Sequence, residues 1–239
     1  MDVLTGIPEV ILKNLQDKSV EKRRQAAIDL QDIIEKLIQT NQMEVIYTRI
    51  EMFSTMVNVD VHPALNTEKD NPSKRRQGLY GLSVIAMTLY QKQQVNFLDK
   101  VMPPVIKSLN DKDPKVVLAA CDAIFNIVKT CKEEILRYDQ FLEIFSGIIH
   151  LIEIGTSFNT DVKEYSKKVD DLLKDVVRRS LIKDLTFNLD TLIDAICNKL
   201  RSCKNPDGQM VLIKWIETLH SITNVNILKC VPRFLEKMF

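Results

Sequence analysis

The chain repeats one pattern, a polar turn followed by an amphipathic helix. In the clearest copy residues 108–115 form the turn, Asp113 is placed to cap the helix, and Pro114 suits the first helical position, where its missing N–H is not needed. The apolar residues that follow keep the i, i+3, i+4, i+7 spacing of one helix face; they are Val116, Ala119, Ala120, Ala123, Ile124, Ile127, Val128 and Cys131. The segment therefore predicts a helix with a continuous apolar stripe.

This pattern returns at multiples of 46 or 47 residues. An earlier copy, capped by Ser19, has Asp17 94 residues before Asp111. Further along, Asp161 and Asp207 are 46 residues apart. Two helices in a period of roughly 40 to 47 residues are the signature of HEAT and armadillo repeats. We therefore expect an all-α fold, a HEAT/armadillo-like α-solenoid of antiparallel helix pairs, with the four aspartates in equivalent turns along one edge.

The repeat divides the whole chain into helix pairs. We predict one solenoid domain over residues 1–239, with pairs at about 7–41, 42–92, 95–132, 133–180 and 184–223 and the first helix of a sixth pair within 227–238. Because the sixth pair lacks its second helix, we expect the chain to be the N-terminal fragment of a longer array. Pro103 and Pro232 should kink first helices, and the polar loop 59–73 should be the most mobile internal segment.

The composition sets further limits. With 6 glycines and 8 prolines in 239 residues, the chain has few tight turns for an all-β fold. A net charge of +1 gives the chain no overall positive potential that would attract nucleic acid. The longest uncharged stretch, between Arg76 and Lys92, is shorter than the roughly 20 residues of a membrane-spanning helix. Five cysteines without a CxxC pair favour a reducing, cytoplasmic compartment over a disulfide framework.

Catalytic chemistry finds no support in the sequence. There is no phosphate-binding glycine loop and no GxSxG or HExxH motif, and the three histidines have no evident partners. We expect His150, Cys121 and Cys131 to pack in the core. We also assign Trp215 to the interior, because it stands in the apolar stripe of its helix. The prediction is a protein that is not an enzyme and has no catalytic residue, cofactor or metal.

Basic residues gather in the first turns of the second helices. Lys74, Arg75 and Arg76 stand together without an acid in their helix, and cations at that end oppose the helix dipole. A partner carboxylate or phosphate would relieve this repulsion; the alternative is a solvated face with Glu68 and Asp70 as neighbours. If equivalent turns align, the candidate partner-binding residues form a ladder along one edge. They are Lys22, Arg23, Lys74, Arg75, Arg76, Lys115 and Lys163.

Four segments carry a specific resemblance. Residues 21–27, 74–82, 121–129 and 172–177, in this order and spacing, resemble the N-terminal HEAT region of the vacuole-morphology scaffold of the phosphatidylinositol 3-phosphate 5-kinase (PIKfyve) complex. The similarity covers nearly the whole chain and is interrupted by an insertion at residues 64–71. It implies a non-catalytic scaffold on the cytosolic face of endosomal or vacuolar membranes that regulates synthesis of phosphatidylinositol 3,5-bisphosphate.

The resemblance also implies partners, namely the phosphatidylinositol 3-phosphate 5-kinase and a Sac-type phosphoinositide phosphatase. It further implies peripheral, indirect membrane association and self-association through the absent C-terminal part. The predicted helices carry both basic and acidic residues on their surface, and this mixture of charges argues against a nucleic-acid partner. Two other classes stay open from the residues alone. One is a transport or coat adaptor of the karyopherin or adaptin type, and the other is a peripheral binder of anionic lipids.

Overall fold

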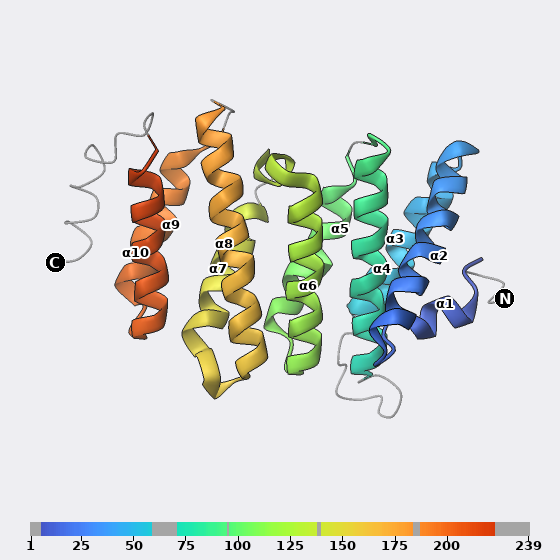
Figure 1. Ribbon diagram of the computed structural model, residues 1–239, viewed down its shortest axis with the longest axis horizontal. Coiled ribbons are helices and arrows are strands. Elements are labelled where there is room, and N and C mark those ends of the chain that lie inside the picture. The colour runs from blue at the N-terminus through green and yellow to red at the C-terminus, as the bar shows by residue number, and fades with distance from the viewer. Residues whose placement is uncertain (1–5, 59–70, 95, 138–139, 184–186, 223–239) are drawn as a thin grey trace. The chain divides into compact units, whose positions relative to one another are not determined.

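The computed structural model describes residues 6–58, 71–94, 96–137, 140–183 and 187–222. These residues form ten α-helices, three short 3-10 segments and no β-strand, which confirms the predicted all-α, solenoid-type fold class. The helices in Figure 1 are α1 (Glu9–Asn14), α2 (Val20–Gln39), α3 (Met43–Val57), α4 (Pro72–Gln91), α5 (Leu98–Lys107), α6 (Pro114–Cys131), α7 (Gln140–Ile154), α8 (Thr160–Ile182), α9 (Leu189–Ser202) and α10 (Pro206–His220).

The chain divides into two compact units, Met1–Thr130 and Cys131–Phe239. The division falls beside the predicted border between the third and fourth helix pairs. The pairs of the first unit are α1 with α2, α3 with α4 and α5 with α6, and those of the second unit are α7 with α8 and α9 with α10. The odd-numbered helices are called first helices and the even-numbered ones second helices. One continuous solenoid domain over residues 1–239 stays a prediction.

Helix α4 is largely buried in the first unit. It packs against α2, α3 and α5, and its side chains Leu79, Leu82 and Ile85 are fully buried. Gly81 allows α4 to approach α3 closely, because a Cβ atom there would lie 2.4 Å from the buried ring of Phe53. The uncharged stretch of the sequence is thus a core helix. Within the described residues, no helix combines the length and apolar character needed to cross a membrane.

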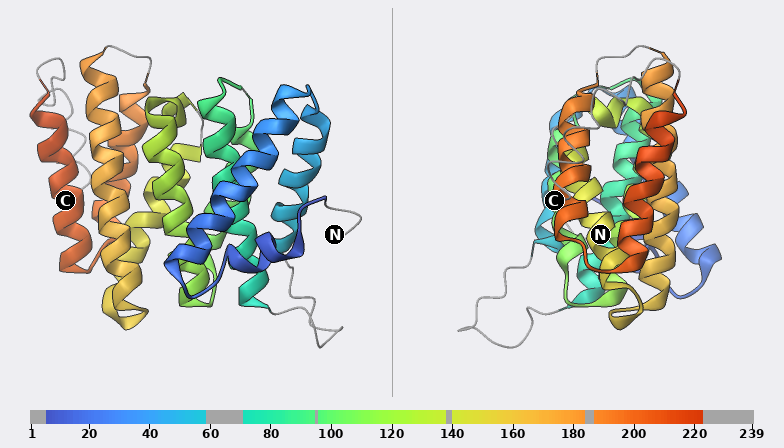
Figure 2. Two further views of the ribbon diagram at one scale, coloured as in Figure 1. Left: turned by 45° about the vertical axis from the view of Figure 1, so that its right-hand side comes forward. Right: turned by 90° about the vertical axis from the view of Figure 1, so that its left-hand side faces the viewer.

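In the second unit, α7 lies against both α8 and α10 (Figures 1 and 2). The rings of Phe145 on α7 and Trp215 on α10 meet edge to face, with centroids 5.3 Å apart, and both side chains are fully buried. Leu173 and Val177 of α8 are also fully buried. The prediction that Trp215 lies in the interior is confirmed.

One predicted helix needs correction. The expected helix at the start of the fourth pair, residues 133–154, is broken into a 3-10 segment at Lys132–Arg137 and a helix, α7, that begins at Gln140. Lys132, the first residue of this segment, has a φ of 50°, in the left-handed region, so the right-handed helix α6 ends at Cys131 and does not continue into it. The apolar pattern hid this break because it continues through both segments.

Helix α5 contains Pro103 and ends after ten residues in a 3-10 turn at Ser108–Asn110, and the kink expected at Pro103 stays a prediction. Such tight turns are common at the ends of α-helices. Three other predictions fall outside the described residues; they concern Pro232, the segment 227–238 and most of the loop 59–73.

Candidate partner-binding surface

Each second helix begins at a polar residue that caps its first turn. Asp113 Oδ1 accepts a hydrogen bond from the Lys115 amide at 2.8 Å, which confirms the predicted cap, and Asn159 Oδ1 accepts from the Val162 amide at 3.0 Å. In chain order the caps are Ser19, Asn71, Asp113, Asn159 and Asn205, which are 52, 42, 46 and 46 residues apart. The caps therefore mark the position at which the repeats align.

The four aspartates expected in equivalent turns occupy two different positions, so that prediction was wrong. Asp17 and Asp111 each precede a cap by two residues, and each accepts a hydrogen bond from the backbone amide of that cap at 2.8 Å. Asp161 and Asp207 each follow a cap by two residues, within the first helical turn. A carboxylate can satisfy free amides from either side of a cap, so aspartate spacing alone does not fix the register.

Arg75, the fourth residue after its cap, lies in the interior. Its side chain is 5% exposed, its Nη2 donates to Asp111 Oδ1 at 3.1 Å, and its Nε lies 2.8 Å from Asp111 Oδ2. Asp111 precedes α6, so this ion pair joins α4 to the turn of the next helix pair. The expectation of one exposed cluster at residues 74–76 is therefore corrected, since Arg75 is not at the surface.

Lys163 makes the corresponding link in the second unit. It also stands four residues after its cap, and its Nζ lies 2.5 Å from Oδ2 of Asp207 in the next helix pair. The side chain of Lys163 is 15% exposed and that of Asp207 is 48% exposed, so solvent reaches this pair. The hydrogen bond and charge of Lys163 hold the pKa of Asp207 below its ordinary value.

Two further arginines hold the turn between α1 and α2. Arg23 Nη1 donates to the Asp17 carbonyl at 2.7 Å, and Arg76 Nη2 donates to the Gln16 carbonyl at 3.3 Å. The guanidinium groups thereby satisfy carbonyl oxygens just beyond the end of α1. Arg76 links α4 to the preceding helix pair, whereas Arg75 links it to the following one.

The three remaining candidates, Lys22, Lys74 and Lys115, are exposed. Lys22 Nζ lies 3.3 Å from Asp17 Oδ2. The proposed neighbours of the basic cluster, Glu68 and Asp70, lie outside the described residues. The seven candidates therefore divide into side chains that hold turns together and lysines that face solvent.

A row of polar side chains crosses the second helices of the first unit. It consists of Arg23 on α2, Arg76 and Tyr80 on α4, and Asp122 on α6, and we call it the polar row. Arg76 and Tyr80 share a side-chain hydrogen bond, while burial and the nearby charge of Asp122 raise the pKa of Tyr80, which keeps its hydroxyl protonated. Sequence analysis did not assign Tyr80 or Asp122. The available signal was the i+4 spacing of Arg76 and Tyr80, which puts them on one helix face.

Apolar side chains continue this surface along α6. Leu118 and Phe125 are half-buried and stand four residues before and three residues after Asp122, on the same helix face. Lys129 Nζ lies 5.9 Å from the centroid of the Phe125 ring. We call Tyr80, Leu118, Asp122 and Phe125 the second-helix surface. Accessible aromatic and aliphatic groups next to an arginine resemble the composition of protein-binding surfaces.

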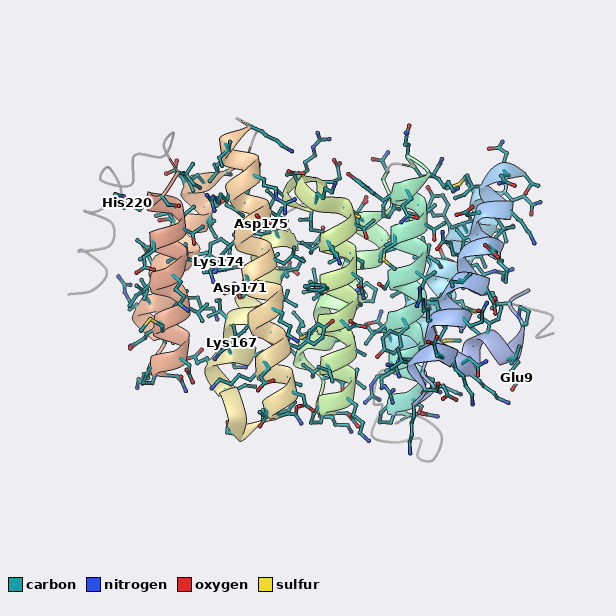
Figure 3. All side chains as sticks on the ribbon, in the orientation of Figure 1. Glu9, Lys167, Asp171, Lys174, Asp175 and His220 are labelled. Carbon is teal, nitrogen blue, oxygen red and sulfur yellow. The ribbon has the colours of Figure 1, made fainter. Side chains whose placement is uncertain are left out.

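A buried ion pair within α8 is joined to α10 by a hydrogen bond in the second unit. Asp170, which is 2% exposed, pairs with Lys174 and accepts a hydrogen bond from Trp215 Nε1 at 2.7 Å. Burial raises the pKa of Asp170, although the charge of Lys174 opposes this shift. Figure 3 labels Lys174 on α8, and its Nζ lies 5.6 Å from the centroid of the Trp215 ring. These partners satisfy one another inside the core, so the cluster has a structural role.

One histidine and two cysteines were expected to pack in the core, and the structure gives the burial of each. His150 is exposed, which corrects the prediction that it packs in the core; the buried face of α7 passes through Phe145 and Ile149, and residue 150 points to the opposite side. Cys121 and Cys131 are buried as predicted, and burial raises the pKa of Cys131 to about 12. Within the part of the chain that the structure describes, no three His, Cys, Asp or Glu side chains gather as possible metal ligands.

Comparison with known proteins confirms the resemblance. Residues 73–175 match the family described as the Vacuolar 14 Fab1-binding region. The whole chain aligns with 29% of the Protein VAC14 homolog of Arabidopsis thaliana at 28% identity. With the Vacuole morphology and inheritance protein 14 of Saccharomyces cerevisiae it is 27% identical, over 96% of this chain and 28% of that protein. The Schizosaccharomyces pombe VAC14 homolog is 25% identical over 95% of this chain. The chain thus spans less than a third of the length of these relatives.

Proposed function

We propose that this chain is a non-catalytic scaffold segment that binds a lipid kinase of the Fab1 type, a phosphatidylinositol 3-phosphate 5-kinase. The observation that carries the proposal is the match of residues 73–175 to a Fab1-binding region. That range contains almost all of α4, all of α5, α6 and α7, and the first part of α8. It also contains the whole second-helix surface.

The second-helix surface is the proposed contact in the first unit. Tyr80 offers a protonated hydroxyl, and Leu118 and Phe125 offer apolar area that is not fully buried. Aromatic side chains of this kind contribute strongly to binding when a partner desolvates them. Arg75 and Arg76 have a different role in this proposal: their bonds to neighbouring turns fix α4, and so they position Tyr80.

The more specific parts of the proposed function come from the resemblance to the vacuole-morphology scaffold. The chain would help to regulate synthesis of phosphatidylinositol 3,5-bisphosphate at the cytosolic face of endosomal or vacuolar membranes. A Sac-type phosphatase is the second proposed partner, and self-association is assigned to sequence beyond this chain. The relatives are more than three times as long as the part aligned here, so each of these functions is a proposal for this chain.

Capture of a purified Fab1-type kinase by the immobilised 239-residue chain tests the proposal. The double substitution Leu118→Ser with Phe125→Ser should weaken capture by about 30-fold, because each interface side chain contributes about 1 kcal/mol or more. Ile28→Ser is the matched control, since Ile28 is a partly exposed aliphatic residue on α2, outside residues 73–175. Circular dichroism should show equal helix content in all three proteins.

Two results would contradict these statements. Equal kinase capture by the double variant and by Ile28→Ser would show that the second-helix surface is not the contact. If the unmodified chain captures no kinase, the proposed function itself is wrong.

A further inference from the structure

Exposed lysines gather at one edge of the first unit. Lys18 and Lys22 flank the start of α2, Lys74 lies in the first turn of α4, and Lys112 and Lys115 flank the start of α6. All five are exposed, and we call them the lysine edge. Figures 1 and 2 show the three helices starting at the same edge of this unit. The turns concerned are residues 16–22, 71–76 and 110–116.

The aspartates of these turns form hydrogen bonds and ion pairs within the protein. Asp17 and Asp111 accept hydrogen bonds from backbone amides, Asp111 also pairs with buried Arg75, and Asp113 caps α6. In the three turns, Glu21 is the remaining acid and is exposed. The turns carry seven basic residues and four acids, and their two arginines, Arg75 and Arg76, bond to groups within the protein, so the charge presented to solvent is positive and comes from lysine.

An exposed apolar residue lies among these lysines. Val20 is the first residue of α2, between Lys18 and Lys22, and is 67% exposed. Burial of an aliphatic side chain next to cationic groups is the combination by which peripheral proteins hold an anionic membrane surface. A single valine adds little apolar area, so the lysines must supply most of the attraction.

We propose that the lysine edge docks the chain directly on an anionic lipid bilayer. Protein partners tend to select arginines and aromatic groups in partly desolvated positions, but here the arginines are engaged with carbonyl oxygens and Asp111. Lysines are compact, flexible, strongly hydrated charges that suit a surface of many mobile headgroups. This inference goes beyond the proposed kinase binding and does not rest on it.

Flotation of the 239-residue chain tests the docking surface. The probe is a vesicle of phosphatidylcholine and phosphatidylserine at about three to one, compared with phosphatidylcholine alone. The triple substitution Lys22→Gln, Lys74→Gln and Lys115→Gln should weaken binding by about 100-fold, because each lysine near an anionic surface contributes roughly fivefold.

The matched control removes the same charge from the other ends of the same helices. It combines Lys36→Gln in the last turn of α2, Lys92→Gln at the C-cap of α4 and Lys129→Gln in the last turn of α6, all at exposed positions. This variant should bind vesicles nearly as well as the unmodified chain. Both triple variants should keep their helix content by circular dichroism.

A fluorescent reporter gives a second test that does not depend on removing charge. Val20→Trp adds one tryptophan to a chain whose single native tryptophan, Trp215, is fully buried. Emission from position 20 should shift to shorter wavelength with the anionic vesicles and stay unchanged with the neutral ones, because only docking moves that side chain into an apolar layer.

Equal vesicle binding by the two triple variants, or an unchanged emission of Val20→Trp with anionic vesicles, would overturn the proposal. Loss of kinase capture by the lysine-edge variant with intact vesicle binding would also overturn it, since the edge would then be a protein-binding surface. The two proposals are separable: if the unmodified chain binds vesicles but captures no kinase, the docking surface stands and the proposed function does not.

Discussion

The first unit joins consecutive helix pairs at their turns, whereas the second unit relies on a contact in the middle of its helices. In the first, buried Arg75 meets Asp111 across the pair boundary. In the second, the equivalent residue, Lys163, meets Asp207 in a partly exposed pair, and Asp170 accepts a hydrogen bond from Trp215 deeper in the core. The fourth residue after the cap therefore contributes differently to stability in the two units, because Arg75 is more deeply buried than Lys163.

The difference follows from the chemistry of the two side chains. A guanidinium group is planar and presents two nitrogens toward one carboxylate, as Nε and Nη2 of Arg75 do toward Asp111. A lysine offers a single point charge, and an exposed pair of that kind contributes little because water and salt screen it. The second unit therefore needs another link between its helix pairs, and the Asp170–Trp215 contact supplies it.

Removal of Arg75 should produce the largest effect. Arg75→Ala leaves the carboxylate of Asp111, 13% exposed, without its buried cation, and the expected loss in free energy of unfolding is about 3 to 5 kcal/mol. Urea denaturation followed by circular dichroism measures it. The neighbouring Lys74→Ala should change stability by no more than about 0.5 kcal/mol, since Lys74 is exposed. Similar losses in the two variants would show that Arg75 is not a structural link.

Replacement of Trp215 should have the next largest effect. Trp215→Phe removes the hydrogen bond to Asp170 and leaves a void in the second unit, with an expected loss of about 2 to 3 kcal/mol. Denaturation followed by circular dichroism applies here, because the variant has no tryptophan. A loss below that of a surface substitution would mean that the Asp170–Trp215 contact does not hold α10 in place.

Arg75→Lys sharpens the comparison, because it gives the first unit the kind of cation that the second unit uses. The variant keeps the charge but replaces two nitrogens facing Asp111 by one, so its stability should lie between those of Arg75→Ala and the unmodified chain. Thermal unfolding of the three proteins side by side gives the order. If Arg75→Lys were as stable as the unmodified chain, the two-nitrogen geometry of the guanidinium group would contribute nothing to stability.

Lys163→Gln should have the smallest effect on stability, and the size of that effect depends on pH. The pKa of Asp207 is lowered from its ordinary value of 3.8 in the folded protein, so the pair stabilises the fold above that pH and the contribution is lost as pH falls through the folded value. The variant lacks this contribution and should therefore lose less stability than the unmodified chain during acidification. Denaturation curves at neutral pH and near pH 3 give both numbers. If acidification lowered the stability of both proteins by the same amount, the Lys163–Asp207 pair would not be the cause of the loss.

Local features were predictable from the sequence, and features that depend on packing between helix pairs were not. The cap at Asp113 and the burial of Trp215 follow from neighbouring residues and helix periodicity. The partner of Arg75 is 36 residues away, and nothing in the local pattern distinguishes this buried arginine from exposed Lys74. The charge of Asp122 on α6 acts on Tyr80 of α4 for the same reason, through the packing of separate helices. A basic run in a first turn therefore does not reveal which of its members face solvent.

We propose that the Fab1-type kinase contacts the second-helix surface, while Arg75 and Arg76 fix α4 through their bonds to neighbouring turns. Hydrogen–deuterium exchange of the 239-residue chain, alone and bound to purified kinase, measures this directly. We predict slower exchange in the bound state for peptides of α4 around Tyr80 and of α6 from Leu118 to Phe125, and no change in α10. Slower exchange confined to the turns of the lysine edge, or to segments outside residues 73–175, would contradict the account.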